Sequence, residues 1–299
     1  MKNVYLLVYI IMFVGCTSSS DNVVKPNLLV IMADSLSYID IGVYGQESVS
    51  ATPNIDRLAQ EGVCFTNGYS ISSNSASGQY ALMTGRCPWK ETGGEEMITL
   101  PEMMKKVGYK TAAIGTWHSK VEQIPGETAR RMGFGYSGSE ADIGLSDYSI
   151  YEAVDFISRQ KKEPFFLYYG LGGETVSSIH EEIDKYIGKL LSCLSDWEML
   201  DNTLIVFSSY RSSVDENNHV PFFVYWKGKI SPVVSDALVS PLDLIASLGK
   251  LVGVSMPEGL DSHEYVNAFM GKSLEARDEL VLEVQGEIRK VYANRNDRS

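Results

Sequence analysis

The chain has 299 residues, of which 44% are hydrophobic and 21% charged, so it is long enough to bury a large core. Its formal net charge of -12, with no basic stripe along the sequence, argues against a nucleic-acid partner, because phosphate binding relies on clustered Lys and Arg. We therefore expect one principal globular domain with a small appendage.

The first 22 residues carry the features of an export leader followed by a tether. Lys2 precedes an apolar run from Val4 to Val14, which is too short to span a bilayer and suits the core of a signal peptide. Gly15-Cys16 at its end is typical of a bacterial lipoprotein signal, in which the cysteine is lipidated after cleavage. The alternative is a plain secretory signal in which Cys16 is incidental. We predict an exported, membrane-anchored lipoprotein of the periplasm or cell surface, held to the membrane only through Cys16.

Short apolar runs alternate with longer helical patterns along the mature chain, which is typical of a parallel sheet covered by helices on both faces. In chain order, the pattern predicts a strand at 28–32, helices at 55–61, 79–83 and 100–107, a strand at 111–114, a helix at 148–160, a strand at 165–169, a helix at 177–195, strands at 204–207 and 222–226, and a helix at 241–251. The predicted fold class is α/β with a mostly parallel central sheet.

Two further segments complete the predicted organisation. Residues 121–145 are rich in Gly, Ser and charged residues, and we expect a long irregular excursion there. Near the C-terminus, apolar runs at 279–284 and 287–293 flank Gln285-Gly286, which predicts a short antiparallel hairpin. The predicted division is a leader and tether over 1–22, an α/β domain over 23–253 and a truncated C-terminal subdomain over 254–299.

Polar residues follow three of the predicted strands. Asp34 ends the first strand, His118 lies shortly after the second, and Arg211 follows the strand at 204–207. Because ligands bind at the carboxyl ends of strands in open α/β sheets, we expect these side chains to meet at one crevice.

Several short motifs, in their order along the chain, resemble the sulfatase family, within the alkaline phosphatase superfamily. They are Tyr44-Gly45, Thr52 to Ala59, Gly62-Val63, Phe65 to Asn67, Leu82 to Arg86, Gly108 to Thr111, Gly115 with Trp117-His118, and Asp201 to Thr203. The resemblance covers the chain from Pro26 to about Gly271. It implies a sulfatase-like fold and hydrolysis of sulfate esters of carbohydrates or small molecules. In that family, a Cys or Ser oxidised to formylglycine attacks sulfur beside a calcium ion.

The resemblance places Ser75 at the nucleophile position, which would make this a serine-type member. The alternative is that Ser75 is one of many loop serines and only caps a helix. The family's maturation signal has Pro or Ala two residues later and Arg four residues later, where this chain has Ser77 and Gln79. Formylglycine at Ser75 is therefore doubtful, since Gln79 cannot supply the permanent charge of an arginine.

Two positions after the second strand also match the family. His118 aligns with a histidine that the resemblance implies to act in catalysis or to bind sulfate, the alternative being a structural histidine packed beside Trp117. Thr116 stands where the family has a lysine. The resemblance thus implies catalytic positions at Ser75 and His118, and substrate-binding positions at Gln79 and Thr116.

The implied metal site retains few of its ligands. Asp34 matches the first aspartate of a family pair whose second member is Ser35 here, and Tyr210 and Arg211 stand where the family has further ligands. Calcium takes roughly six to eight oxygen ligands, so a site built on Asp34 is weak or lost. Our hypothesis is that Arg211 replaces the metal's charge and pairs directly with Asp34; the alternative is that Arg211 is a surface loop residue.

Three functions remain open from the sequence. The first is an exported sulfatase acting on a sulfated carbohydrate or small sulfate ester, with a degraded site and little or no turnover. The second is a non-catalytic accessory protein or glycan-binding pseudoenzyme at the cell surface. The third is a phosphoesterase using unmodified Ser75, which we rank last because that chemistry normally needs two metals.

Overall fold

The computed structural model describes residues 24–44, 52–90, 97–118, 127–138, 146–172, 179–213 and 217–293. The predicted leader and Cys16 therefore lie outside the described residues. Within these ranges, no helix has the length and apolar character needed to cross a bilayer.

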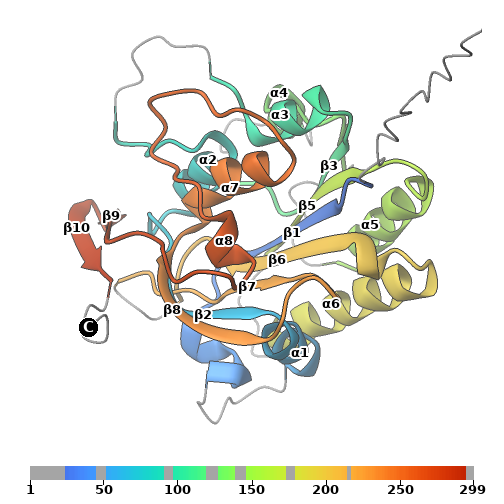
Figure 1. Ribbon diagram of the computed structural model, residues 1–299, viewed down its shortest axis with the longest axis horizontal. Helices are drawn as coiled ribbons and strands as arrows, with labels where there is room; N and C mark the ends of the chain where they lie inside the picture. Colours follow the sequence, from blue (N-terminus) through green and yellow to red (C-terminus); the bar gives the residue numbers. More distant parts are fainter. Residues whose placement is uncertain are drawn as a thin grey trace, which may run out of the picture.

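The strands and helices follow one another as an α/β chain with a C-terminal hairpin (Figure 1). The strands are β1 Asn27–Ala33, β2 Val63–Gly68, β3 Lys110–Gly115, β4 Tyr136–Ser137, β5 Phe165–Leu171, β6 Thr203–Ser209, β7 Phe222–Tyr225, β8 Val233–Val239, β9 Glu279–Val284 and β10 Glu287–Tyr292. The helices are α1 Pro53–Glu61, α2 Ser75–Thr84, α3 Leu100–Lys106, α4 Glu127–Arg131, α5 Asp147–Arg159, α6 Ile179–Asp196, α7 Leu244–Leu251 and α8 Val266–Phe269.

Eight strands form the central sheet in the order β4-β3-β5-β1-β6-β7-β2-β8. Strand β1 lies parallel to β5 and to β6, β3 lies parallel to β5, and β2 lies parallel to β8. Only β7 runs antiparallel to its neighbours β6 and β2. The prediction of a mostly parallel sheet is confirmed.

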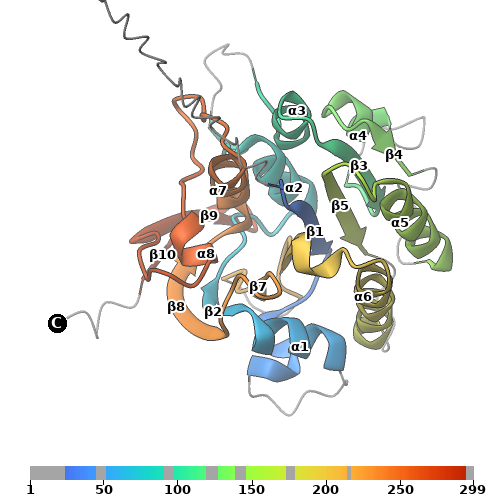
Figure 2. The same cartoon turned by 45° about the vertical axis from the view of Figure 1, so that its right-hand side comes forward.

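Helices cover both faces of this sheet, as Figures 1 and 2 show. Every residue of β1 is buried, and its side chains alternate between two cores: Leu28 and Val30 belong to one, Leu29 and Ile31 to the other. Helices α2, α3 and α7 pack on the first core, and α1, α5 and α6 on the second. This alternation explains why the strand reads as a continuous apolar run.

The predicted strands and longer helices are all present, within a few residues of the expected bounds. The sequence pattern missed β2, β4 and β8, and the short helices α4 and α8. Strand β2 ends in Thr66-Asn67-Gly68 and β8 contains Ser235-Asp236, so neither is a continuous apolar run. The expectation of a long irregular excursion over 121–145 is corrected in its described part, 127–138, where the short elements α4 and β4 lie. An element as short as α4 gives too few turns for a periodic signal.

The predicted C-terminal hairpin is confirmed. Strands β9 and β10 pair antiparallel, with Glu287 opposite Val284. The two turn residues, Gln285 and Gly286, have φ of 54° and 88°, which a two-residue type I′ turn requires. One face of β9 is buried in a small third core, to which it contributes Leu280, Leu282 and Val284. Ala81 of α2 belongs to the same core. The proposed boundary at residue 253 stays a prediction.

Candidate functional site

Side chains from three strand ends and one helix line a cavity of about 390 Å³ at the carboxyl edge of the sheet. The lining residues are Asp34, Ser73, Asn74, Ser75, Ala76, Trp117, His118 and Arg211. Asp34 follows β1, Trp117 and His118 follow β3, and Arg211 follows β6. Strands β1 and β6 are neighbours in the sheet, and β3 is separated from β1 by β5. The predicted convergence of strand ends on one crevice is therefore observed.

The backbone around Asp34 is fixed by hydrogen bonds to both neighbouring strand ends. The Asp34 N–H donates to Leu171 O at 2.8 Å, and the Tyr210 N–H donates to Ala33 O at 3.0 Å. The hydroxyl of the fully buried Ser209 accepts the Leu36 N–H at 2.9 Å and lies 2.9 Å from the carbonyl oxygen of Arg211. One serine thus ties together the two segments that carry Asp34 and Arg211. The sequence predicts no role for Ser209, whose signal is only a polar residue closing an apolar strand.

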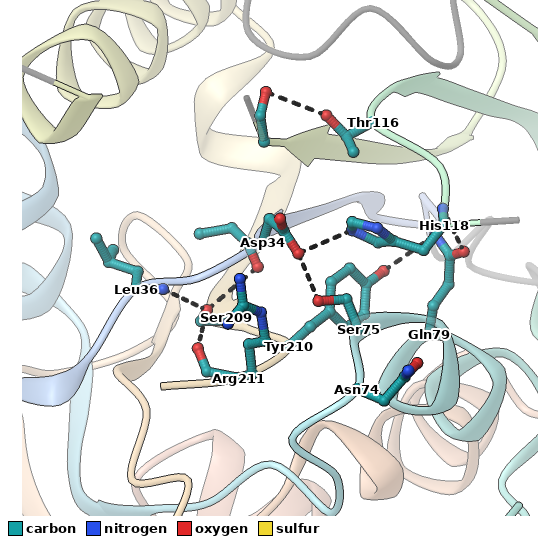
Figure 3. A network of polar contacts seen from close by, with 12 residues as sticks. Asp34, Leu36, Asn74, Ser75, Gln79, Thr116, His118, Ser209, Tyr210 and Arg211 are labelled. Carbon is teal, nitrogen blue, oxygen red and sulfur yellow. Dashed lines mark hydrogen bonds and ion pairs between the residues drawn. The ribbon is translucent and has the colours of Figure 1, made fainter. Parts of the chain in front are cut away.

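Asp34 is the centre of the polar contacts in the cavity (Figure 3). The Ser75 hydroxyl donates to Asp34 Oδ1 at 2.5 Å, and His118 Nε2 lies 3.2 Å from the same oxygen. The Asp34 and His118 side chains are 24% and 18% exposed, so the contacts are partly shielded from water. The Ser75 hydroxyl and the His118 imidazole therefore both lie against the same oxygen atom of Asp34.

Ser75 is the first residue of α2, and the residue before it caps the helix. The Asn74 side chain accepts the Ser77 N–H at 3.2 Å, which is the usual N-cap bond. The alternative in which Ser75 itself caps the helix is thus not what the structure shows. Helix α2 begins at Ser75, and the backbone N–H groups in the first turn of a helix stabilise nearby negative charge.

The chain reaches His118 through a tight passage between β3 and β5. Gly115 has φ of 83°, and a side chain there would place its Cβ 2.1 Å from Gly170 O. Only glycine fits this conformation and this approach. After it, the buried Trp117 ring packs edge-on against Phe134 and Tyr168, which anchors the residue preceding His118.

Burial lowers the pKa of His118 below its ordinary 6.5; the Asp34 carboxylate acts in the opposite direction and the Arg211 charge in the same direction as burial. This shift favours the neutral form of His118 at pH 7. Protonation, which becomes favourable only at a lower pH, adds a positive charge to the cavity.

We expect the affinity of this cavity for an anion to rise as the pH falls from 7.5 to 5.5, by up to roughly tenfold, because binding to protonated His118 is linked to proton uptake. Calorimetric titration with an anionic ligand across this pH range measures it. A His118→Gln variant should lose the pH dependence. An affinity that is flat with pH in the wild-type protein contradicts the assignment of His118 to the anion site.

The expected direct ion pair between Arg211 and Asp34 is not formed. Both side chains line the cavity, but among the described residues no ion pair to the Arg211 guanidinium is found, and Asp34 Oδ1 is instead engaged by Ser75 and His118. Oδ1 of the carboxylate already accepts the Ser75 hydroxyl, and the His118 imidazole lies beside the same oxygen. The Arg211 guanidinium, whose charge reaches His118, is left to face the cavity.

Gln79 and Thr116, the predicted substrate-binding positions, lie near the cavity without being among the residues that line it. Gln79 is buried, and its amide contacts His118, Tyr168 and Tyr210. The Thr116 hydroxyl donates to Gly172 O at 3.3 Å. Their roles in binding stay predictions, whereas the lining residues Ser73, Asn74 and Ala76 were not predicted.

The residues that the structure describes around the cavity do not fit the calcium ion that the resemblance implies. Asp34 is the one acidic residue among those lining the cavity, and no group of three or more His, Cys, Asp or Glu side chains with metal-binding geometry occurs in the described ranges. Calcium needs roughly six to eight oxygen ligands with several carboxylates. One carboxylate oxygen that already accepts a hydroxyl hydrogen bond does not meet this need.

Comparisons with known proteins agree with the fold and the order of these elements. The sulfatase family model matches residues 26–174 and 175–254. An N-acetylgalactosamine-6-O-sulfatase of Bacteroides thetaiotaomicron is 26% identical, with 94% of this chain and 85% of that protein covered. The human N-acetylgalactosamine-6-sulfatase is also 26% identical, over 78% of this chain but 63% of its own length.

Solved structures give the same result. A Bacteroides thetaiotaomicron protein from work on the metabolism of glycosaminoglycans superposes with a TM-score of 0.80 over 90% of this chain and 86% of that one, at 24% identity. The PsFucS1 sulfatase of Pseudoalteromonas sp. superposes with a TM-score of 0.73 over 90% of this chain and 78% of its own, at 22% identity. With a family model spanning most of the described fold, the chain belongs to the sulfatase family.

Proposed function

We propose that this sulfatase-family protein binds sulfated carbohydrate in the cavity around Asp34 and hydrolyses sulfate esters slowly or not at all. The observation that carries the proposal is the contact between Ser75 Oγ and Asp34 Oδ1 in a cavity with one acidic lining residue. The nucleophile position and the first metal-ligand position of the family are thus bonded to each other. A hydroxyl held by a lone carboxylate lacks the Lewis acid on which fast attack at sulfur depends.

The remaining groups suit an anionic ligand. Arg211 brings a permanent positive charge and a planar set of donors that can bind two oxygens of a sulfate. The first turn of α2 adds backbone N–H donors beside Ser75. The negative charge of Asp34 repels an anionic ligand. The hydrogen bond that Asp34 accepts from Ser75, together with the nearby His118 ring, weakens this repulsion. In this role Arg211 supplies positive charge that a metal provides in active relatives.

Fast turnover is further disfavoured by the absence of fixed positive charge at two predicted substrate positions. Gln79 and Thr116 are neutral, and both engage other groups of the protein. The alignment with the Bacteroides thetaiotaomicron sulfatase runs over 436 positions, more than the 299 residues of this chain, so that relative carries insertions lacking here. These observations favour a non-catalytic, glycan-binding protein as the second form of the same proposal.

The test is calorimetric titration with N-acetylgalactosamine 6-sulfate, chosen from the names of the two curated relatives, and with unsulfated N-acetylgalactosamine as control. We expect measurable binding of the sulfated sugar and at least roughly tenfold weaker binding of the control, since the sulfate carries the charge-assisted contacts. Equal affinity for the two sugars would refute the proposal. Mass spectrometry of the Ser75 peptide, after expression with a serine-type maturation enzyme, shows separately whether formylglycine forms.

We also propose that the protein is exported and anchored through a lipid on Cys16. The support is the sequence alone: an apolar run after Lys2 that ends in Gly15-Cys16. A Cys16→Ala variant should move from the membrane fraction to the soluble fraction of the producing bacterium, because it lacks the thiol to which the proposed lipid anchor is attached. A variant that stays with the membrane would show that the attachment has another cause.

A further inference from the structure

A buried polar network lies directly behind the cavity. It consists of Gln79 in α2, Tyr168 in β5 and Tyr210 after β6, which are 3%, 0% and 1% exposed. Gln79 Nε2 lies 3.0 Å from Tyr168 Oη and 3.4 Å from Tyr210 Oη, and the Tyr210 hydroxyl donates to Tyr168 Oη at 2.5 Å. None of the three is among the residues that line the cavity.

The direction of each hydrogen bond in this network is determined. The His118 backbone N–H donates to Gln79 Oε1 at 3.0 Å, so the amide nitrogen of Gln79 must face the two tyrosines. Since Tyr210 donates to Tyr168, the Tyr168 hydroxyl has its own proton for Thr116 O at 3.4 Å. The network therefore forms hydrogen bonds to both ends of segment 116–118, at the Thr116 carbonyl oxygen and at the His118 backbone N–H.

The same residues also shape the surroundings of the imidazole. The Tyr210 ring stands edge-on to His118, with ring centres 5.4 Å apart and an interplanar angle of 89°. His118 Nε2 also lies 3.2 Å from Asp34 Oδ1. The imidazole thus contacts both a buried phenol ring and the carboxylate of the cavity.

We propose that Gln79, Tyr168 and Tyr210 are positioning residues that fix His118 against Asp34. The inference rests on the proposed function in one respect, namely that His118 acts on a ligand in this cavity. The network does its work without charge: a fully satisfied set of neutral hydrogen bonds makes a buried polar cluster rigid, whereas a buried charge beside Asp34 would need its own partner. Burial also raises the pKa of Tyr168 and of Tyr210 well above 10, so both phenols keep their protons.

The test compares three Tyr→Phe variants of the full chain. Tyr168→Phe and Tyr210→Phe each remove one hydroxyl of the network. Tyr169→Phe is the matched control, because Tyr169 is the next residue of β5 but its hydroxyl contacts Ser149 in the opposite core, at 3.1 Å. A fourth variant, Gln79→Met, removes the acceptor for the His118 amide and keeps the length of the side chain.

The readout is the NMR titration of the His118 ring, assigned by its loss in His118→Asn, together with the affinity for N-acetylgalactosamine 6-sulfate. In the three network variants we expect the pKa of His118 to rise toward 6.5, because a loosened ring gains water, and the affinity to fall by roughly fivefold or more. Tyr169→Phe should match the wild-type protein in both. Equal loss of melting temperature in all the Tyr→Phe variants leaves this comparison intact.

Two outcomes separate the inference from the function on which it rests. If His118 titrates identically in all folded variants and in the wild-type protein, the network is purely structural and the inference is overturned, whatever the ligand affinity. If the wild-type protein binds no sulfated sugar but the His118 titration changes only in the network variants, positioning is supported and the proposed function fails.

Discussion

Replacing Arg211 by glutamine is expected to weaken binding of N-acetylgalactosamine 6-sulfate by roughly 10- to 100-fold, the range that charge-assisted hydrogen bonds contribute. Among the residues that line the cavity, Arg211 carries the permanent positive charge. No ion pair to its guanidinium is found among the described residues. Glutamine keeps much of the side-chain length but removes the charge. Calorimetric titration of the variant measures the loss.

The matched control is Arg57→Gln. Arg57 lies in α1 on the other side of the sheet and pairs with Glu61 on the surface, at 2.9 Å. This variant should bind the sugar as the wild-type protein does. An Arg211→Gln affinity within about twofold of the wild-type value would remove Arg211 from the binding site.

Replacing Arg277 by methionine is expected to lower the free energy of unfolding by about 3–5 kcal/mol, the usual cost of leaving a buried charge without its partner. Arg277 contacts the fully buried Asp243 with two nitrogens, at 2.6 and 2.8 Å, and donates to Asp261 O at 2.6 Å. Without the guanidinium, Asp243 keeps the His263 N–H at 2.9 Å but no opposite charge. Urea unfolding followed by circular dichroism measures the effect.

The comparison variant is Arg159→Met, which breaks an exposed pair with Asp155 in α5 whose side chains are 69% and 54% exposed. Such surface pairs contribute about 0.5 kcal/mol or less. A loss in Arg277→Met as small as in Arg159→Met would contradict the structural role of the buried pair. Arg277 lies between α8 and β9, and Asp243 directly precedes α7, so the pair joins the segment before the C-terminal hairpin to the start of α7.

Most of the sheet could be predicted because buried parallel strands are written as continuous apolar runs, as in β1, β5 and β6. The edge strand β8 and its neighbour β2 were missed, since polar residues interrupt the apolar run of each strand and their pairing depends on contacts distant in sequence. The antiparallel insertion of β7 between β6 and β2 has no local signal either. Which strands pair is decided by tertiary packing rather than by local propensity.

That Asp34, His118 and Arg211 line one cavity could also be predicted, because each follows a strand, whereas the predicted positions Gln79 and Thr116 are not among the lining residues. The contacts between the site residues could not be predicted. Sequence placed Arg211 against Asp34, whereas Asp34 accepts from Ser75 and lies beside His118. Likewise, the sequence suggested that Gln79 was a lost substrate ligand, and its contacts to Tyr168 in β5 and to Tyr210 after β6 can be seen only in the folded structure.

The most direct test of the central claim is the release of inorganic sulfate from N-acetylgalactosamine 6-sulfate by the purified protein, with added calcium and with a chelator. The protein is produced with the serine-type maturation enzyme, so that formylglycine has the opportunity to form at Ser75. With a lone carboxylate and neutral side chains at Gln79 and Thr116, we predict release at or near the background rate, unchanged by calcium. Rapid release that calcium restores and the chelator abolishes would contradict this account.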